Sequence, residues 1–177
     1  MHHTPQQSLW AKLQRLLRHH WQGRHPAQRA LPPEALERLL QRVRASEAQH
    51  SGEIRLCIEA ALPISYLWRG LAARQRAVML FGKLRVWDTA HNNGVLIYLL
   101  LAERAIEIVA DRGLQPYVSE AQWQSMAQGM SAAFAQGRYE DGLNQALGEV
   151  SAVMLQHFTL AAGEQHQNQL PDQATIL

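Results

Sequence analysis

The feature that most constrains the fold is the apolar run at residues 95–102, which reads VLIYLLLA and is the longest unbroken one in the chain. Bulky and β-branched side chains in a run of this length are typical of a strand that is buried on both faces. A second β-rich segment, Ala105–Ala110, follows after Glu103 and Arg104. Such a short polar break predicts a hairpin turn. The sequence therefore predicts an antiparallel strand pair at the centre of the fold.

A further strand and a helix precede this pair. Apolar residues alternate with other residues from Ile54 to Glu59, which is the period of a strand. The segment 71–84 has the spacing of a helix, and residues 63–70 form a connection. A strand, a helix and a buried strand in succession predict a right-handed parallel crossover. The expected sheet is therefore small and mixed, with a βαβ unit and one antiparallel strand.

Three more helices are expected around this sheet. Pro32-Pro33-Glu34 marks the start of one, which ends near Gly52 with the glycine in a left-handed turn. Ser119 and Gln122 form a capping box for the second, which Gly137 ends. The third has a buried stripe between residues 143 and 158. One interpretation of the loop before the central strand is that Asn93-Gly94 permits a turn with positive φ.

The first 31 residues form a basic arm, with five Lys or Arg residues and no acid. Residues 8–21 have leucines near helical spacing, and Trp10, Lys12, Arg15 and Arg18 are candidate contacts to a membrane or partner. A basic amphipathic helix can lie on an anionic membrane surface. The alternative is that Trp10 and the leucines dock on the domain while the charged residues stay in solvent.

The rest of the composition indicates one domain, residues 32–158, followed by a polar tail, residues 159–177, that we expect to be disordered. The part after residue 31 has 12 basic and 15 acidic residues, so we expect no nucleic-acid partner. The single cysteine, Cys57, is typical of a reducing compartment. No apolar run is long enough to span a membrane, and no signal sequence is evident. We therefore predict a cytoplasmic protein, with the arm as a means of peripheral attachment to the inner face of the membrane.

Polar residues are expected to gather at one end of the sheet. The first and central strands are parallel, so their starts lie at the end where the returning strand finishes. This places residues 51–53, 88–93 and 111–113 together, and the candidate metal ligands there are Glu53, Asp88, Asn92 and Asp111. Carboxylate and amide oxygens are suited to Ca²⁺ or Mg²⁺, and Arg112 is a candidate anion-binding residue. The alternative is that these residues only cap helices and form turns.

Motifs for nucleotide binding and hydrolase chemistry are absent. The chain lacks GxxxxGK, GxGxxG and GxSxG, so we expect no nucleotide cofactor and identify no catalytic nucleophile. Cys57 lies in the middle of a predicted strand without an adjacent base, which argues against a role as a nucleophile.

Four segments resemble the TPM-domain family in order and spacing. These are residues 51–55 (SGEIR), 87–98 (WDTAHNNGVLIY), 107–113 (EIVADRG) and 134–142 (FAQGRYEDG). The match covers about residues 33–158 and is most similar to a cytosolic branch of the family. Exported members tend to have Gly-Tyr-Gly where this chain has Asp111-Arg112-Gly113.

The resemblance implies a three-layer α/β/α sandwich with helices on both faces of the sheet. It also implies several roles, because some relatives are described as acid phosphatases or Ca²⁺ binders and relatives often occur with LemA-type membrane proteins. We expect an accessory or binding domain that holds a divalent cation at the sheet end. One alternative is a metal-assisted phosphomonoester hydrolase, and another is a structural protein that acts with a LemA-type membrane protein.

Overall fold

In the part of the chain that the computed structural model describes, residues 9–22, 27–161, 163–171 and 173–177, the sheet has four strands in the order β3-β2-β1-β4. The strands are β1 (Glu53–Glu59), β2 (Gly94–Leu100), β3 (Ala105–Ala110) and β4 (Thr175–Ile176). β1 is parallel to β2 and β4, whereas β3 is antiparallel to β2. The predicted mixed sheet is confirmed. All seven residues of β2 are buried, as expected for a strand covered on both faces.

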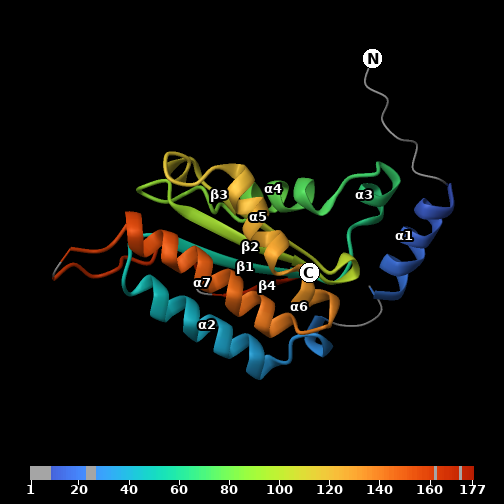
Figure 1. Cartoon of the computed structure of the whole chain (residues 1–177), viewed down its shortest axis with the longest axis horizontal. Coiled ribbons are helices and arrows are strands. Elements are labelled where there is room, and N and C mark those ends of the chain that lie inside the picture. Colours follow the sequence, from blue (N-terminus) through green and yellow to red (C-terminus); the bar gives the residue numbers. More distant parts are fainter. Residues whose placement is uncertain (1–8, 23–26, 162, 172) are drawn as a thin grey trace, which may run out of the picture.

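Helices cover both faces of this sheet (Figure 1). One face packs against α2 (Pro33–Glu47), α5 (Glu120–Gly129), α6 (Ser131–Ala135) and α7 (Tyr139–His157). The other face packs against α3 (Ile64–Trp68) and α4 (Ala73–Lys83). Successive β2 side chains alternate between the two cores: Ile97 lies with α2 and α7, and Tyr98 lies with α4. The predicted α/β/α sandwich is therefore confirmed.

Short 3₁₀ turns complete the connections: η1 (Ala27–Arg29), η2 (Leu101–Glu103) and η3 (Arg112–Leu114). The predicted hairpin between β2 and β3 is present, but η2 and a left-handed Arg104 lengthen its turn. The predicted helix at 119–137 is divided into α5 and α6 at Met130. Its predicted capping box at Ser119 and its left-handed Gly137 are both confirmed.

The predictions for Gly52 and Gly94 were wrong, because neither residue has a positive φ. A Cβ at Gly94 would lie 1.9 Å from the carbonyl oxygen of Val86, and one at Gly52 would lie 2.4 Å from the Met154 sulfur. Gly94 is therefore required by its close approach to backbone, whereas a Cβ at Gly52 would meet only the flexible side chain of Met154. The left-handed residue of the loop before β2 is Asn92, with φ 51°.

The C-terminal segment, which we expected to be a disordered tail, packs on the domain where the structure describes it. Leu170 is buried in the α4 core, and β4 pairs with Cys57 and Ile58 of β1. The segment had no apolar period by which sequence could reveal it. At the other boundary, Ala27 and Leu31 are buried with α2, so the core begins before the predicted residue 32.

Helix α1 (Leu9–Gln22) lies at the edge of the molecule beside α3 (Figure 1). The docking alternative for this helix named the wrong side chains. Trp10 is 67% exposed, while Arg15 and His19 form the contacts with the domain. Among the described residues, no helix is long and apolar enough to cross a membrane.

Candidate functional site

Three polar segments meet at one end of the sheet, as the strand directions predicted. Glu53 is paired with Gly94 at the start of β1 and β2, and the amide of Asp111 donates to the Gly94 carbonyl at 2.9 Å. The Asn93 side-chain amide donates to Ser51 Oγ at 3.2 Å. The loops before β1 and β2 and the loop after β3 are therefore in contact.

Most of the predicted metal ligands at this end interact with their neighbours. The exposed carboxylate of Asp88 lies 2.8 Å from Arg85, and Asn92 Oδ1 accepts from Arg112 Nε at 3.0 Å. Asp111 Oδ1 accepts from the Arg112 amide at 2.7 Å and caps η3. Burial raises the pKa of Asp111, and its Oδ2 is buried without a hydrogen bond. Of these residues, Asp111 caps a helical turn, Asn92 lies in a left-handed turn, and Asp88 forms an ion pair instead of a cap. The predicted cation among these four residues stays a prediction.

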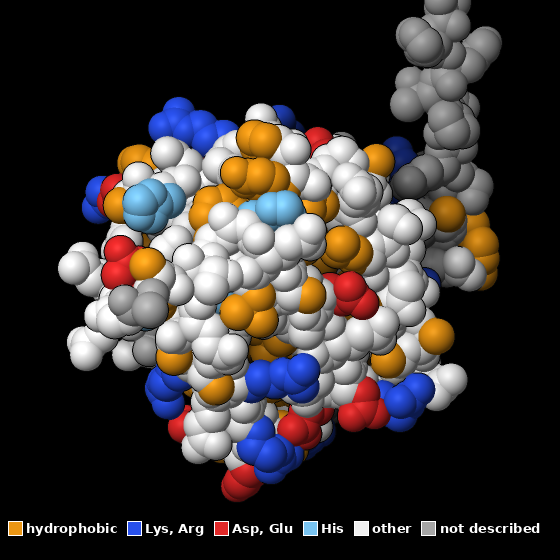
Figure 2. Space-filling model, turned by 60° about the vertical axis from the view of Figure 1, so that its left-hand side comes forward, with side chains coloured by type: hydrophobic (Ala, Val, Ile, Leu, Met, Phe, Trp, Pro, Cys, Tyr) orange, Lys and Arg blue, Asp and Glu red, His pale blue; other side chains and the backbone are white. Residues whose placement is uncertain are grey.

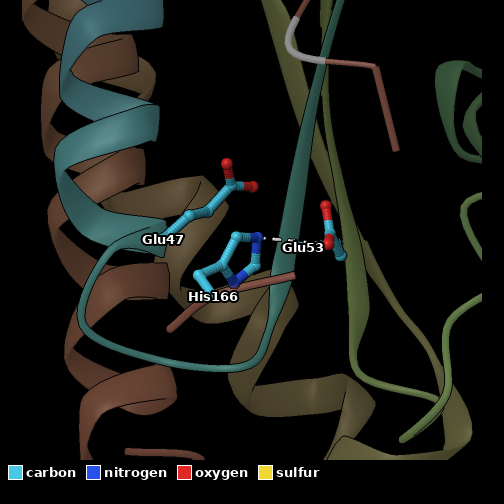
Figure 3. Close-up of side chains that lie close together, drawn as sticks. All are labelled: Glu47, Glu53 and His166. Atoms are coloured by element: carbon cyan, nitrogen blue, oxygen red, sulfur yellow. Dashed lines mark ion pairs between the residues drawn. The ribbon is translucent and has the colours of Figure 1, made fainter. Parts of the chain in front are cut away.

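Glu53 lies in a different cluster. Among the described residues, Glu47, Glu53 and His166 form a group that could hold a metal ion. Each offers one ligand atom, and these three atoms lie within 4.8 Å of one another. Glu47 is the last residue of α2, Glu53 is the first of β1, and His166 comes from the C-terminal segment. Figure 3 shows the imidazole between the two glutamates. We call these three residues the Glu–Glu–His cluster.

Backbone amides orient both carboxylates. Glu47 accepts from the Ile54 amide at 2.7 Å. Glu53 accepts from the amides of Gln169 and Leu170 at 2.8 and 3.3 Å. The two residues are only 3% and 1% exposed. Two carboxylates so close together in a buried site repel each other, and a cation between them relieves that repulsion.

The imidazole of His166 has the orientation of a metal ligand. Its Nδ1 lies 2.9 Å from the carbonyl oxygen of His50, so this nitrogen is the donor. Its Nε2 lies 3.2 Å from Glu53 Oε1 but forms no hydrogen bond of normal geometry. A histidine that donates through one nitrogen to a carbonyl presents the lone pair of the other to a metal. The same nitrogen can instead carry a proton and form an ion pair with Glu53.

A polar depression gives access to this cluster. It has a volume of about 490 Å³ and is lined by Ser51, His91, Glu164, His166 and Gln169, among others. The side chain of His166 is 11% exposed, so the cluster can exchange a small ion with solvent. On the face of the molecule shown in Figure 2, charged side chains of both signs lie beside each other towards the lower edge. Access to the cluster is through the polar depression lined by Ser51, His91 and His166.

A buried histidine, His50, supports His166. His50 Nδ1 lies 3.1 Å from the Gly52 carbonyl oxygen, and its Nε2 lies 2.8 Å from Ser46 Oγ. Burial lowers the pKa of His50 to about 4, so its imidazole is neutral at pH 7. The Ser46 and His50 side chains are both buried, which makes them a structural support for the His50 carbonyl that holds His166.

Sequence reasoning identified Glu53 but missed Glu47 and His166. His166 lay in the tail that was expected to be disordered. Glu47 did leave a signal, because an acid in the last turn of a helix is unfavourable to the helix dipole. Glu47 therefore adds nothing to the stability of its own helix, and it lies six residues before Glu53 at the start of β1.

Comparisons with known proteins agree with this fold. The chain is similar to the BA42 protein from the psychrophilic bacterium Bizionia argentinensis, with a TM-score of 0.69 and 24% identity over 82% of this chain and 94% of that one. It is also similar to the N-terminal domain of a P. gingivalis protein, with a TM-score of 0.59 and 20% identity over 74% and 82% of the two chains. At these identities the likeness concerns the fold alone. A comparison with curated proteins finds no match.

The amino-acid sequence itself shows the family to which the chain belongs. The profile of the TPM domain matches residues 27–153, which begin at η1 and end within α7. This range contains the whole sheet except β4, both packed faces and two members of the Glu–Glu–His cluster. The chain therefore belongs to the TPM-domain family.

Proposed function

We propose that this TPM domain is a binding module that holds a divalent cation in the Glu–Glu–His cluster. The observation that carries the proposal is the orientation of His166, whose Nδ1 is held by the His50 carbonyl while Nε2 faces Glu53 at 3.2 Å. The adjacent carboxylate of Glu47 supplies a third ligand. Two carboxylates and one imidazole are a ligand set for Zn²⁺, Mn²⁺ or Fe²⁺ more than for Ca²⁺, which prefers oxygen ligands alone.

The proposed cation would join three parts of the chain. Glu47 ends a helix, Glu53 begins a central strand, and His166 belongs to a segment more than one hundred residues later. A cation bound to all three stabilises the packing of the C-terminal segment on the sheet. The depression of about 490 Å³ leaves room for a water or a small anion beside the ion.

Thermal unfolding with and without cation tests this proposal. A cation that binds only the folded chain at a hundredfold excess over its Kd adds about 2.7 kcal/mol to the free energy of unfolding. We expect Mn²⁺ or Zn²⁺ to raise the Tm of the parent chain, and EDTA to reverse the effect. Glu47→Gln and His166→Gln should each abolish this response. Direct binding of Mn²⁺, followed by its paramagnetic resonance, separates site binding from weak contacts with other histidines.

Asp88→Asn is the matched control, because Asp88 is an exposed carboxylate at the same end of the sheet. It should leave the response to Mn²⁺ unchanged. A Ca²⁺ response that disappears in Asp88→Asn and Asp111→Asn, but persists in Glu47→Gln, would place the cation in the loops predicted from sequence instead. If none of these cations changes the Tm, the cluster is an ion pair between Glu53 and protonated His166, and the proposal fails.

Hydrolysis of a phosphomonoester is the alternative to binding alone. It requires the bound cation to activate a water or to hold the phosphate. A generic phosphomonoester incubated with the Mn²⁺-loaded chain measures this directly. Turnover that is lost in both Glu47→Gln and His166→Gln would make the cluster a catalytic metal centre rather than a binding site.

A further inference from the structure

Helix α1 docks on the domain through its polar side. Arg15 Nε donates to Glu103 Oε1 at 2.7 Å, and Arg15 Nη2 donates to the Leu71 carbonyl at 2.6 Å. His19 Nε2 lies 2.9 Å from the same Glu103 oxygen, and the Leu62 amide donates to His19 Nδ1 at 3.0 Å. Because Arg15 and His19 are four residues apart, both lie on one face of the helix. This face is the one that meets the domain.

The opposite side of α1 is apolar and faces solvent. Trp10, Leu13, Leu17 and Trp21 follow one another at spacings of three, four and four residues, and their exposed fractions are 67%, 46%, 60% and 65%. A surface helix ordinarily buries such a stripe and exposes its charges. In α1 the arrangement is reversed, so the docking of the helix does not account for its apolar side chains.

The apolar surface continues onto α3. Ile64 and Trp68 are 67% and 76% exposed, and α3 contacts α1. Between the two helices lies a groove of about 320 Å³, lined by Leu16, Leu17, Leu62, Ile64 and Leu67 among others. We call the exposed set Trp10, Leu13, Leu17, Trp21, Ile64 and Trp68 the α1–α3 surface. It contains three of the five tryptophans in the chain.

The charge around the α1–α3 surface is positive. Residues 9–22 and 60–72 contain no Asp or Glu. Lys12, Arg18 and Arg69 are exposed within them. The acid that meets α1, Glu103, is paired with Arg15 and His19. An apolar surface rich in tryptophan and accompanied by unneutralised cations is complementary to a bilayer with anionic headgroups.

We propose that the α1–α3 surface binds the interface of an anionic lipid bilayer, with the tryptophans at headgroup depth and the cations against the lipid phosphates. The docked helix lies on the membrane as part of a rigid domain, held by Arg15 and His19. This refines the contact set expected from sequence. Trp10 faces the bilayer and Arg18 lies beside the apolar stripe, whereas Arg15 anchors the helix to the domain and Lys12, three residues before Arg15, lies on that docking face.

Flotation of the full chain with vesicles tests the proposal. We expect binding to vesicles with about one-third phosphatidylglycerol, little binding to pure phosphatidylcholine, and loss of binding at high salt. Leu17→Ser and Trp68→Ser should each lower the partition coefficient about tenfold through loss of apolar burial. Arg18→Gln and Arg69→Gln should each lower it about fivefold, since each cation near the surface is attracted by the anionic lipids.

Two matched controls lie outside this surface. Trp87→Ser removes a tryptophan that is 47% exposed, and Lys83→Gln removes an exposed lysine on α4. Both should bind vesicles like the parent chain, and circular dichroism should show that every variant is folded. Equal loss of binding in the controls, or no binding of the parent chain to anionic vesicles, would overturn the proposal. A concentration-dependent dimer that Leu17→Ser abolishes, without vesicle binding, would assign the surface to a second copy of this chain instead.

Discussion

Individual buried polar residues of this chain have roles that depend on residues far away in sequence. His50 is an example, because its imidazole is fully buried and its carbonyl holds His166. Burial lowers the pKa of His50 to about 4 from an ordinary value near 6.5. In the unfolded chain this histidine therefore binds a proton at a higher pH than in the folded chain.

The pH dependence of stability follows from this difference. The contribution of neutral His50 is present above pH 6.5 and is lost as the pH falls from 6.5 towards 4, because the unfolded state then binds more protons. The slope for one proton is about 1.4 kcal/mol per pH unit. Urea unfolding of the parent chain and of His50→Asn over this range measures it. The difference in free energy of unfolding between the two should shrink as the pH falls. A difference that is the same at pH 7 and pH 4.5 would contradict this account.

Gly94, the first residue of β2, is required for packing and not for a turn. A Cβ there would meet the Val86 carbonyl oxygen, which is backbone and cannot rotate away. Gly94→Ala should therefore lower the free energy of unfolding by about 2–3 kcal/mol. Gly82→Ala is the control, because nothing lies within 4 Å of a Cβ at that helical position, and it should raise stability by up to about 1 kcal/mol. Chemical denaturation distinguishes the two, and equal effects would refute the packing argument.

At the scale of elements, the carboxylate of Glu103 contacts two side chains of α1, Arg15 and His19. Burial raises the pKa of Glu103, but hydrogen bonds from His19 and Arg15 outweigh burial and bring that pKa below its ordinary value. Glu103→Gln removes the charge that holds both side chains and should cost about 1–2 kcal/mol. Limited proteolysis should also release α1 sooner. Glu37→Gln, an exposed acid on α2 paired with Arg44, should change stability by less than about 0.5 kcal/mol. If the two variants are alike, α1 is held mainly by other contacts.

Elements with a strong local pattern could be predicted from the sequence. The apolar run of β2, the alternation of β1 and the stripes of α2 and α7 each fall within one continuous segment. The short elements could not be predicted, because α3 and β4 have five and two residues and form through contacts with distant parts of the chain. The residues of the candidate site also differ in whether they could be predicted from sequence. Strand directions predicted where Glu53 lies, but the approach of His166 depends on the fold of the tail.

At the scale of the whole molecule, the two proposed sites lie at opposite ends of the sheet. The Glu–Glu–His cluster is at the start of β1, whereas Glu103, which holds α1, follows the end of β2. Figure 1 shows α1 on one side of the sheet and the loop before β1 on the other. A domain attached to a bilayer through the α1–α3 surface would therefore direct its cation site away from the membrane.

Removal of residues 163–177 tests the connection between the tail and the sheet. This deletion takes away His166, the amides of Gln169 and Leu170 that bind Glu53, and the buried side chain of Leu170. We expect a lower Tm and no response to Mn²⁺, while binding to anionic vesicles persists because α1 is intact. Loss of vesicle binding in a chain that remains folded would show that the two ends are coupled.

The position of β4 also has a consequence for solubility. β4 pairs with the outer edge of β1 opposite Cys57 and Ile58, and Leu177 continues this pairing through the backbone of Ile58 and Ala60. An unpaired strand edge is a template on which another chain can add a strand. We therefore expect the tail to protect this edge of β1 from edge-to-edge aggregation. Conditions that detach it, such as loss of the contacts at Glu53, should produce oligomers that bind amyloid dyes before the domain itself unfolds.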